Sequence, residues 1–434
     1  MILPVPASTV GPPLSVCLLL LLSTVPAHAG DPSAAVREEA AKVLIRPVCA
    51  DPAARAKIVD QMIAQGGEYE QATAKWDLDT ACEQIDLPIK PVHDTADTAD
   101  GASHKNWLYD ARWSGDGKLI VTASADGTVR LWDVATGKML RAIDLSSRLQ
   151  APKPSGTQLP QAFPPAEDAT KTRVRAARFI GDGGAIVVSA DKQPVRMFNV
   201  ESGEPIAEIP YKHPDPSWDM PPNIETTAGG LVVLGGYGGE LVVYDTKTKA
   251  ERYRLPGIDR EYPQFAVSEA AGLLATTAPG VNRSVMIQLR KLENGQKFWE
   301  TEAKGDTSAY AMAFSRDGKQ LAAAVHGNAF IYDTGSQKLV STILVYPTFG
   351  SFEVAFTPDG KRLIAGSRHA QLWDIATGKR LLHYGPFSDL CHSLDVSPDG
   401  KYLATSHMGS DGRIWDVETG TFFRRLGKNV HPPG

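Results

Sequence analysis

The residues of this 434-residue chain with the clearest chemical potential are a histidine, two hydroxyl residues and an aspartate. They are His104, Thr122 or Ser124, and Asp126. A hydroxyl, an imidazole and a carboxylate support nucleophilic catalysis when the imidazole lies between the other two groups. The same groups can instead form a hydrogen-bond network that joins strands, here extended to the indole of Trp132. The residue types alone leave both interpretations open.

The other reactive side chains do not form a recognisable metal or phosphate motif. No two of six further histidines are spaced as His-x-His or His-x-x-x-His, and the six are His213, His326, His369, His383, His392 and His407. The glycine-rich stretch "GGYGGE" predicts a hairpin, because no helix follows it. The aspartates of "GDG", "RDG" and "PDG" are turn formers. We expect no catalytic residue, no metal site and no cofactor.

The N-terminus resembles an export signal. The apolar run Leu14–Val25 is followed by Ala27-His28-Ala29, a small-x-small cleavage pattern, although no Lys or Arg precedes the run. The run is shorter than the roughly 20 residues that span a membrane. We therefore expect residues 1–29 to be a removed signal peptide and the protein to be periplasmic or secreted, without stable membrane insertion. An uncleaved membrane anchor is the alternative.

Residues 30–86 predict a small α-helical segment. Asp51 is suited to an N-cap, Pro52 follows at the first helical position, and Gly66 stands just past the expected end. Further helical patterns lie on both sides of this helix, and the segment is expected to form a small cap or appendage.

Export changes the expected state of the cysteines. Cys49 and Cys82 both lie in the helical segment, and an oxidising compartment favours a disulfide between them. Such a bond would stabilise the segment by roughly 3 kcal/mol in the chain-entropy model. Cys391 is left over, in an apolar strand pattern, and is expected to be a buried and inert thiol.

The rest of the chain repeats one strand–turn unit, first seen as "SADGTVRLWDVATGK" from Ser124. The glycines of its first turn are Gly117, Gly183, Gly229, Gly272, Gly318, Gly360 and Gly400. Their intervals are 66, 46, 43, 46, 42 and 40 residues, and all but the first approach the 40–45 typical of four-stranded propeller blades. A single unit has an apolar face that it cannot bury alone, so seven units are expected to stack around an axis.

The repeated residues resemble the WD-repeat β-propeller family over about residues 100–427. The family dipeptide occurs as Trp132-Asp133, Trp373-Asp374 and Trp415-Asp416, with variants at Tyr244-Asp245 and Tyr332-Asp333 and a weaker one at Phe198-Asn199. The resemblance, to an exported bacterial-type member, implies an all-β, seven-bladed β-propeller of four-stranded blades, preceded by the helical segment. It also implies a structural rather than catalytic role for His104, Ser124, Asp126 and the tryptophans Trp132, Trp373 and Trp415. The later blades lack the histidine of this network, and Phe387 occupies its place in blade seven.

These patterns divide the chain into five parts. They are the signal peptide at 1–29, the helical segment at 30–86, a linker or closing strand at 87–103, the propeller at 104–427 and a tail at 428–434. The outer strand of the last blade can come from "FFRRL" near the C-terminus, and Ile85–Val92 could replace or extend it. We favour a contribution from the N-terminal side, which would tie the helical segment to the ring.

Two long, proline-rich connections flank the second blade, Ser146–Thr172 and Pro210–Asn223. Both join an outer strand to the next inner strand, so both should emerge on one face. Aromatic residues and one histidine gather in connections on that face, and they are Phe163, Tyr211, His213, Trp218, Tyr262, Phe265, Tyr346, Phe349, Tyr384 and Phe387. Such residues suit a binding surface, or else they pack onto the rim of the ring.

The expected function is an exported, non-enzymatic scaffold, monomeric itself, that binds an unidentified protein partner. A formal charge of −5 gives no basic footprint for nucleic acid. The alternatives are a lactonase-like or quinoprotein-like propeller enzyme and a small-ligand or glycan sensor. Charged residues or histidines converging in the central channel would favour an enzyme, whereas small and apolar ones would favour the scaffold.

Overall fold

The computed structural model describes most of the repeated part of the chain. The described residues are 51, 53, 104–145, 172–211, 221–236, 240–255, 264–281, 284–303, 309–345, 353–366, 370–384, 391–408 and 411–426. The chain divides into two units, and the ring described below belongs to the unit formed by Val92–Tyr346 and Gly350–Gly434. The proposed signal peptide, the Cys49–Cys82 pair and Ile85–Val92 lie outside the described residues.

Only Asp51 and Ala53 are described in the predicted helical segment. Ala53 is helical, and its backbone N–H donates a hydrogen bond of 2.9 Å to the Asp51 carboxylate. This is the contact expected of an N-cap. The helices themselves lie outside the described part of the chain.

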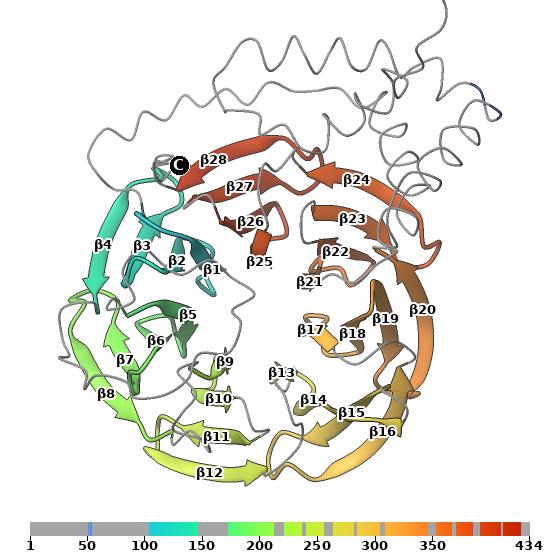
Figure 1. The fold of residues 1–434 in the computed structure, drawn as a ribbon, viewed down its shortest axis with the longest axis horizontal. Coiled ribbons are helices and arrows are strands. Elements are labelled where there is room, and N and C mark those ends of the chain that lie inside the picture. Colours follow the sequence, from blue (N-terminus) through green and yellow to red (C-terminus); the bar gives the residue numbers. More distant parts are fainter. Residues whose placement is uncertain are drawn as a thin grey trace, which may run out of the picture. The chain divides into compact units, whose positions relative to one another are not determined.

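The described ring is all-β and contains seven sheets of four consecutive antiparallel strands, which confirms the predicted seven-bladed propeller (Figure 1). The inner strands are β1 (Leu108–Trp113), β5 (Val174–Ile180), β9 (Asn223–Thr226), β13 (Phe265–Ser268), β17 (Ala309–Phe314), β21 (Glu353–Phe356) and β25 (Cys391–Val396). The second strands are β2 (Leu119–Ser124), β6 (Ala185–Ala190), β10 (Leu231–Gly235), β14 (Leu273–Pro279), β18 (Gln320–Val325), β22 (Arg362–Gly366) and β26 (Tyr402–His407). The third strands are β3 (Thr128–Asp133), β7 (Val195–Asn199), β11 (Leu241–Asp245), β15 (Val285–Lys291), β19 (Asn328–Asp333), β23 (Ala370–Asp374) and β27 (Gly412–Asp416). The outer strands are β4 (Met139–Asp144), β8 (Pro205–Ile209), β12 (Ala250–Leu255), β16 (Lys297–Ala303), β20 (Lys338–Leu344), β24 (Arg380–Tyr384) and β28 (Phe422–Leu426).

The ring closes where the first blade packs against the last. The N–H of Ala111 on β1 donates to the Ser393 hydroxyl on β25 at 3.0 Å, and the N–H of Trp113 donates to the Asp395 carboxylate at 2.8 Å. The outer strand of the last blade is β28, the C-terminal "FFRRL". Within the described residues, the last blade takes its four strands from residues 391–426 and the first blade takes its four strands from residues 108–144.

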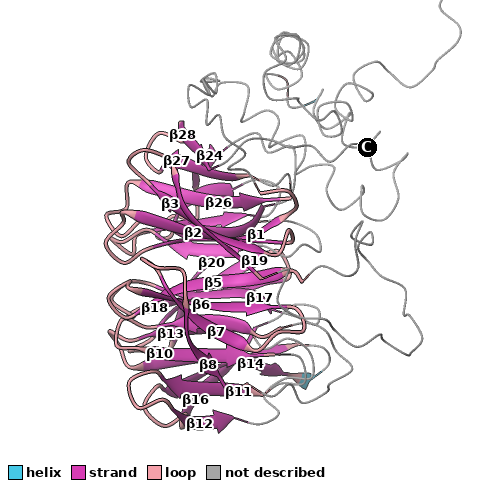
Figure 2. Cartoon of the chain, turned by 90° about the vertical axis from the view of Figure 1, so that its left-hand side faces the viewer, coloured by secondary structure: helices cyan, strands magenta, loops and turns pink. Residues whose placement is uncertain are grey.

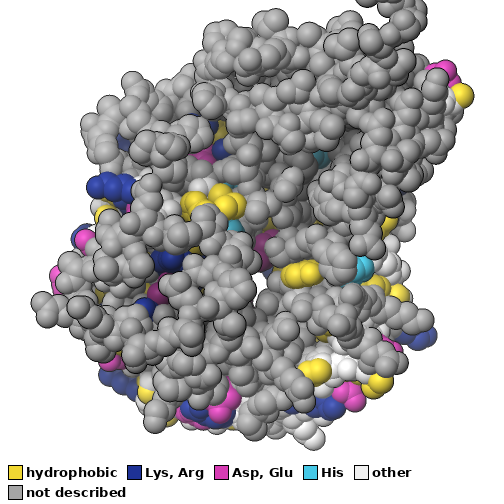
Figure 3. Space-filling view, viewed as in Figure 1, with side chains coloured by type: hydrophobic (Ala, Val, Ile, Leu, Met, Phe, Trp, Pro, Cys, Tyr) yellow, Lys and Arg dark blue, Asp and Glu magenta, His cyan; other side chains and the backbone are white. Residues whose placement is uncertain are grey.

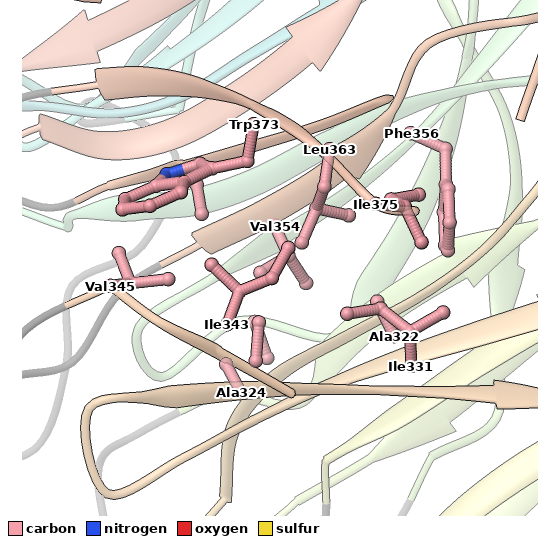
Figure 4. Close-up of a cluster of buried hydrophobic side chains, with 13 residues drawn as sticks. Ala322, Ala324, Ile331, Ile343, Val345, Val354, Phe356, Leu363, Trp373 and Ile375 are labelled. Atoms are coloured by element: carbon pink, nitrogen blue, oxygen red, sulfur yellow. The ribbon is translucent and has the colours of Figure 1, made fainter. Parts of the chain in front are cut away.

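Apolar side chains hold neighbouring blades together, because both faces of each sheet are covered. Between the fifth and sixth blades, Ile331 and Ile343 pack against Val354, Leu363 and Trp373 (Figure 4). Burying one such aliphatic side chain fully stabilises the fold by about 1.5–3 kcal/mol. Six further clusters of this kind lie among the described residues, so the ring has a distributed core and presents its loops from a rigid body.

Glycine turns join the first two strands of each blade. The N–H of Gly117 donates to the Ser114 carbonyl at 2.9 Å, and φ at Gly117 is +73°. The corresponding glycine in the third blade is Gly230, with φ of +97°, rather than the predicted Gly229. Turns of this type line one face of the ring (Figure 2). The inter-blade connections consequently arrive at the opposite face.

Gly318 is the turn glycine at which we expect a substitution to be most damaging. Its φ is +69°, and an added Cβ would lie 2.4 Å from both Ala271 Cβ and Ser268 Oγ. Gly378 has a similar φ of +66° but open space around it. Gly378→Ala should therefore lose only about 1 kcal/mol of stability from backbone strain. Gly318→Ala should lose about 1–3 kcal/mol more, because the fourth blade must move. Urea unfolding of both variants measures the difference, and equal losses would contradict the close packing.

The described part of the chain contains no helix that is both long and apolar enough to cross a membrane.

Candidate functional site

The first blade contains a continuous chain of buried hydrogen bonds. Trp132 Nε1–H donates to Thr122 Oγ1 at 2.8 Å, and Thr122 Oγ1 lies 2.8 Å from His104 Nε2. His104 Nδ1 lies 3.0 Å from the Asp126 carboxylate. The indole can only donate and the carboxylate only accept, so the imidazole carries its proton on Nδ1 and accepts from Thr122 at Nε2. Of the two hydroxyls considered from sequence, Thr122 is therefore the one in this network.

Ser124 lies outside this network and bonds to backbone groups instead. Its hydroxyl donates to the Asn106 carbonyl at 3.1 Å and accepts the N–H of Asp126 at 3.1 Å. Both hydroxyls are fully buried, and His104 is 1% exposed. A substrate could not reach these groups in the folded ring. The arrangement therefore fits a structural network rather than a nucleophilic one.

The network holds its two titratable groups in defined charge states. Burial lowers the pKa of the His104 imidazole below its ordinary 6.5, although the Asp126 carboxylate acts in the opposite direction. Burial alone would raise the pKa of Asp126, but hydrogen bonds from His104, from the Thr128 hydroxyl and from the Lys105 N–H hold it below its ordinary value. The folded protein thus favours a neutral imidazole beside an ionised carboxylate.

This pair predicts acid sensitivity. Unfolded His104 takes up a proton near pH 6.5, whereas the folded residue does so only at lower pH, so falling pH favours unfolding. The stabilisation by neutral His104 should be complete above about pH 6.5 and lost progressively below it. The difference in unfolding free energy between wild type and His104→Gln should therefore shrink between about pH 7.5 and about pH 5.5. A difference that stays constant or grows in acid would contradict this assignment.

The seventh blade forms a related network without a preceding histidine. Trp415 Nε1–H donates to Thr405 Oγ1 at 3.0 Å, and Thr405 Oγ1 lies 2.7 Å from His407 Nε2. His407 is fully buried and occupies in β26 the position that Ser124 occupies in β2. The expectation that later blades lack this histidine is therefore incomplete, because the imidazole comes from within the strand. The sequence signal was the Thr-x-His spacing before the tryptophan.

The sixth blade lacks this network. Ala365 stands in β22 at the place of Thr122, so Trp373 meets no hydroxyl there. Among the described residues, Trp373 Nε1 has no hydrogen-bond partner. The Arg380 guanidinium lies 5.9 Å from the Trp373 ring centre. Trp373 therefore contributes packing to the core rather than a hydrogen-bonded link.

Three of the predicted loop-face aromatics are described, and all three pack into the ring. Phe265 lies on β13, is 7% exposed and belongs to a core cluster. Tyr384 is fully buried at the end of β24, with its hydroxyl donating to the Val417 carbonyl at 2.9 Å. Tyr211 is half-buried against the core, and burial raises its pKa to about 12. The others lie outside the described residues, and they are Phe163, His213, Trp218, Tyr262, Tyr346, Phe349 and Phe387.

A different aromatic group lies where the inner strands of blades seven, one and two begin. Trp107 and Tyr109 meet edge-on at 6.5 Å, and the His392 ring lies 6.3 Å and 5.4 Å from them. The Arg175 guanidinium lies 4.5 Å from the centre of the Tyr109 ring. All four side chains are half-buried. We call them the channel rim, because each stands immediately before or at the start of an inner strand, on the face that receives the inter-blade connections.

The channel rim was not predicted from the sequence, because the candidate binding residues all came from the connections and none from the starts of the inner strands. Trp107 and Tyr109 read as ordinary members of an alternating strand. His392 stands far away in the sequence and joins them only because the seventh blade closes against the first.

Charged side chains occupy the channel below. Asp110 on β1 accepts from Arg112 Nε at 2.9 Å and from Arg178 Nη1 of the second blade. Asp110 also accepts the N–H of Ala177 at 3.2 Å. Arg178 lies 3.7 Å from Glu225 of the third blade. These ion pairs link the inner strands of three consecutive blades.

Two further carboxylates interact with this group, Asp395 from the neighbouring seventh blade and Glu353 from the sixth blade. Burial raises the pKa of Glu353 on β21 and of Asp395 on β25. The positive charges of Arg112 and Arg178 lower both pKa values, and the negative charge of Glu225 raises them. The sixth blade does not adjoin the second or third, so the interactions of Glu353 with Arg178 and Glu225 act across the centre of the ring (Figure 1). Acidic, hydrophobic and histidine side chains are visible around the centre of this face (Figure 3). We define the channel charges as Asp110, Arg112, Arg178, Glu225, Glu353 and Asp395.

The channel therefore differs from the small and apolar lining expected of a simple scaffold. Five of the seven blades contribute a charge, whereas β13 and β17 place the apolar residues Ala266 and Ala313 in register with Arg112 of β1. In the described residues, no three His, Cys, Asp or Glu side chains are grouped to hold a metal ion. The channel charges comprise four carboxylates and two guanidiniums, so their sum is negative when all are ionised.

Cys391 is buried at the start of β25, and its S–H donates to the Ser393 carbonyl at 3.2 Å.

Comparisons with known proteins agree with this architecture. The family model described as "WD domain, G-beta repeat" matches residues 101–133 and 379–416. Eukaryotic translation initiation factor 3 subunit I from Bos taurus is 23% identical over 319 residues, covering 71% of this chain and 78% of that protein, and the Homo sapiens protein gives the same values. WD repeat-containing protein 55 from Arabidopsis thaliana is 23% identical over 253 residues, covering 58% and 69%. The matched segments include the indoles of both hydrogen-bonded networks, Trp132 and Trp415. The seven-sheet ring, these networks and the matched repeats together support a WD-repeat propeller.

Proposed function

We propose that this protein is an exported, non-catalytic propeller that holds a protein partner on the face bearing the channel rim. The observation that carries the proposal is the rim itself. Trp107, Tyr109 and His392 form a contiguous set of half-buried rings. Aromatic residues dominate the energetics of protein interfaces when they are clustered at the centre.

The position of the rim suits binding. Its rings stand on or next to inner strands, which are fixed by hydrogen bonds and by the packing of neighbouring blades. A partner that contacts them therefore orders few additional side chains, and the entropy lost on association is small.

Similarity to known proteins supports a role within an assembly. The relatives include proteins named as a subunit of eukaryotic translation initiation factor 3. A subunit works through contacts with other proteins. We transfer to this chain only that general role, in which a propeller offers a surface to a partner.

Export is part of the proposal and depends on the N-terminal sequence. The apolar run Leu14–Val25 and the Ala27-His28-Ala29 pattern support it, while the compared relatives are eukaryotic. Mass spectrometry of the protein from its native source should find a mature N-terminus at Gly30. Recovery of the intact N-terminus from the cell interior would contradict export.

The charged channel is the feature expected of a propeller enzyme rather than of a simple scaffold, but two observations favour a binding role. The one constellation that resembled a nucleophilic triad is sealed from solvent. In the channel, Asp110, Arg112 and Arg178 are engaged in ion pairs with one another. These residues support the ring and attract a charged group, which is a binding role.

Affinity capture from the native source tests the proposal. The full protein should retain a partner that Trp107→Ala loses, while Phe298→Ala retains it. Phe298 is an exposed ring on the outer strand β16, so its replacement is a matched control for aromatic surface. Thermal melts should show that both variants fold. Equal retention by the two variants would contradict the assignment of the rim.

A further inference from the structure

We propose that the segment of the partner that enters the channel rim is basic, with a Lys or Arg side chain directed towards Glu353 and Asp395. The inference rests on the proposed function and specifies the chemistry of the partner. It follows from the net negative charge of the channel charges, from the unused hydrogen-bond acceptors of Glu353 and Asp395, and from the aromatic residues of the rim.

The carboxylates among the channel charges differ in the number of hydrogen bonds and ion pairs that they make. Asp110 is compensated by Arg112 and Arg178, which both donate to it. By contrast, no hydrogen bond or ion pair joins the Glu353 carboxylate to another described residue. Asp395 accepts one backbone N–H, that of Trp113. The two carboxylates thus retain acceptor capacity, since an ionised carboxylate has about four lone-pair sites.

The two guanidiniums cannot neutralise every carboxylate. Arg112 directs Nη1 to the Leu394 carbonyl at 2.8 Å, and Arg178 directs Nη2 towards Glu225 at 3.7 Å. These contacts direct both guanidiniums to other partners, and their charges act on Glu353 and Asp395 at longer range. An additional cation would meet a net negative charge, whereas an acidic side chain would be repelled.

The ionised forms of Glu353 and Asp395 are unfavourable in the unbound ring. Burial raises the pKa of both groups, and Glu225 adds a like charge that acts in the same direction. A basic side chain between them would offset this desolvation, because opposite charges attract strongly where water is partly excluded.

The rim provides a suitable entrance for such a side chain. The Tyr109 ring already stacks with a guanidinium, that of Arg175, at 4.5 Å. Tryptophan and tyrosine faces attract Lys and Arg through their ring electrons, by about 0.5–2 kcal/mol according to desolvation. Trp107 and His392 lie beside Tyr109, so a basic residue would cross aromatic surface before it reaches the carboxylates.

A labelled peptide tests this inference without knowledge of the partner. The probe is a fluorescein-labelled peptide of Gly and Ala with three Arg residues, and its reference carries citrulline at the same positions. Citrulline keeps the shape of arginine but is neutral. Fluorescence anisotropy with the full-length protein should show about tenfold tighter binding of the Arg peptide. Glu353→Gln should remove most of that preference, and added salt should weaken it.

Glu302→Gln is the matched control, because Glu302 is an exposed acid on the outer strand β16. It changes net charge by the same amount and should leave the preference intact. Equal binding of the Arg and citrulline peptides, or equal effects of the two substitutions, would overturn the inference. A captured partner that is lost on Trp107→Ala but insensitive to Glu353→Gln would also overturn it, while leaving the proposed function standing.

Discussion

Replacing Asp110 with alanine is expected to lower the free energy of unfolding by about 3–5 kcal/mol, the usual effect of breaking a buried ion pair. The carboxylate is 3% exposed and accepts hydrogen bonds from Arg112, Arg178 and the Ala177 N–H. Its loss leaves two guanidiniums without their nearest anion and weakens the contact between the first two blades. Chemical denaturation of the full-length protein measures the effect.

A matched substitution separates this effect from a general loss of charge. Glu302→Ala removes an exposed carboxylate from the outer strand β16, and surface changes of this type usually alter stability by no more than about 0.5 kcal/mol. If Asp110→Ala were as mild as Glu302→Ala, the ion pairs at the inner strands would not hold the ring together.

Thr122→Val is expected to destabilise the protein by about 2–4 kcal/mol. Valine has nearly the same shape as threonine, so packing is kept while the hydroxyl is removed. The Trp132 N–H and the His104 Nε2 then each lose their partner in a buried site, and an unsatisfied buried polar group costs about 1–3 kcal/mol. Thermal or denaturant unfolding measures the change.

Thr342→Val provides the control, because Thr342 is an exposed threonine on the outer strand β20. The same chemical change there should be close to neutral. A similar stability for the two valine variants would show that the hydrogen bonds of the first blade contribute nothing to the fold.

The fold was predictable from the sequence because each blade is encoded by a short pattern of turns and strands, and this pattern is repeated along the chain. A glycine turn, an alternating strand and a second turn recur at nearly constant spacing, so even the fourth blade, which lacks a clear Trp-Asp dipeptide, could be placed. The error at the third blade is local too. Gly229 and Gly230 are adjacent, and only the backbone conformation shows that Gly230 makes the turn.

The hydrogen-bonded networks were partly predictable. The residues of the first blade were recognised as a set, but spacing could not choose between Thr122 and Ser124, which lie on the same strand. The choice depends on which hydroxyl the Trp132 indole reaches. The role of His407 was not predicted, because this histidine lies within strand β26, whereas His104 precedes the first strand of its blade.

The channel could not have been predicted, because its residues meet only after the ring has closed. Asp110 and Asp395 lie at opposite ends of the repeats, and Glu353 belongs to yet another blade. Each reads in sequence as a polar residue of an ordinary strand. Their shared position on inner strands is a property of the seven-fold arrangement and of no single repeat.

Site-specific photo-crosslinking tests the central claim, binding of a protein partner at the channel rim, most directly. A photoreactive phenylalanine analogue is placed at Tyr109 in one sample and at Phe298, on the outer strand β16, in another. Irradiation in the native source should give a discrete adduct with a second protein from position 109 and none from position 298. Adducts from position 298 alone, or no adduct from position 109 while the protein is folded, would contradict a binding face at the channel rim.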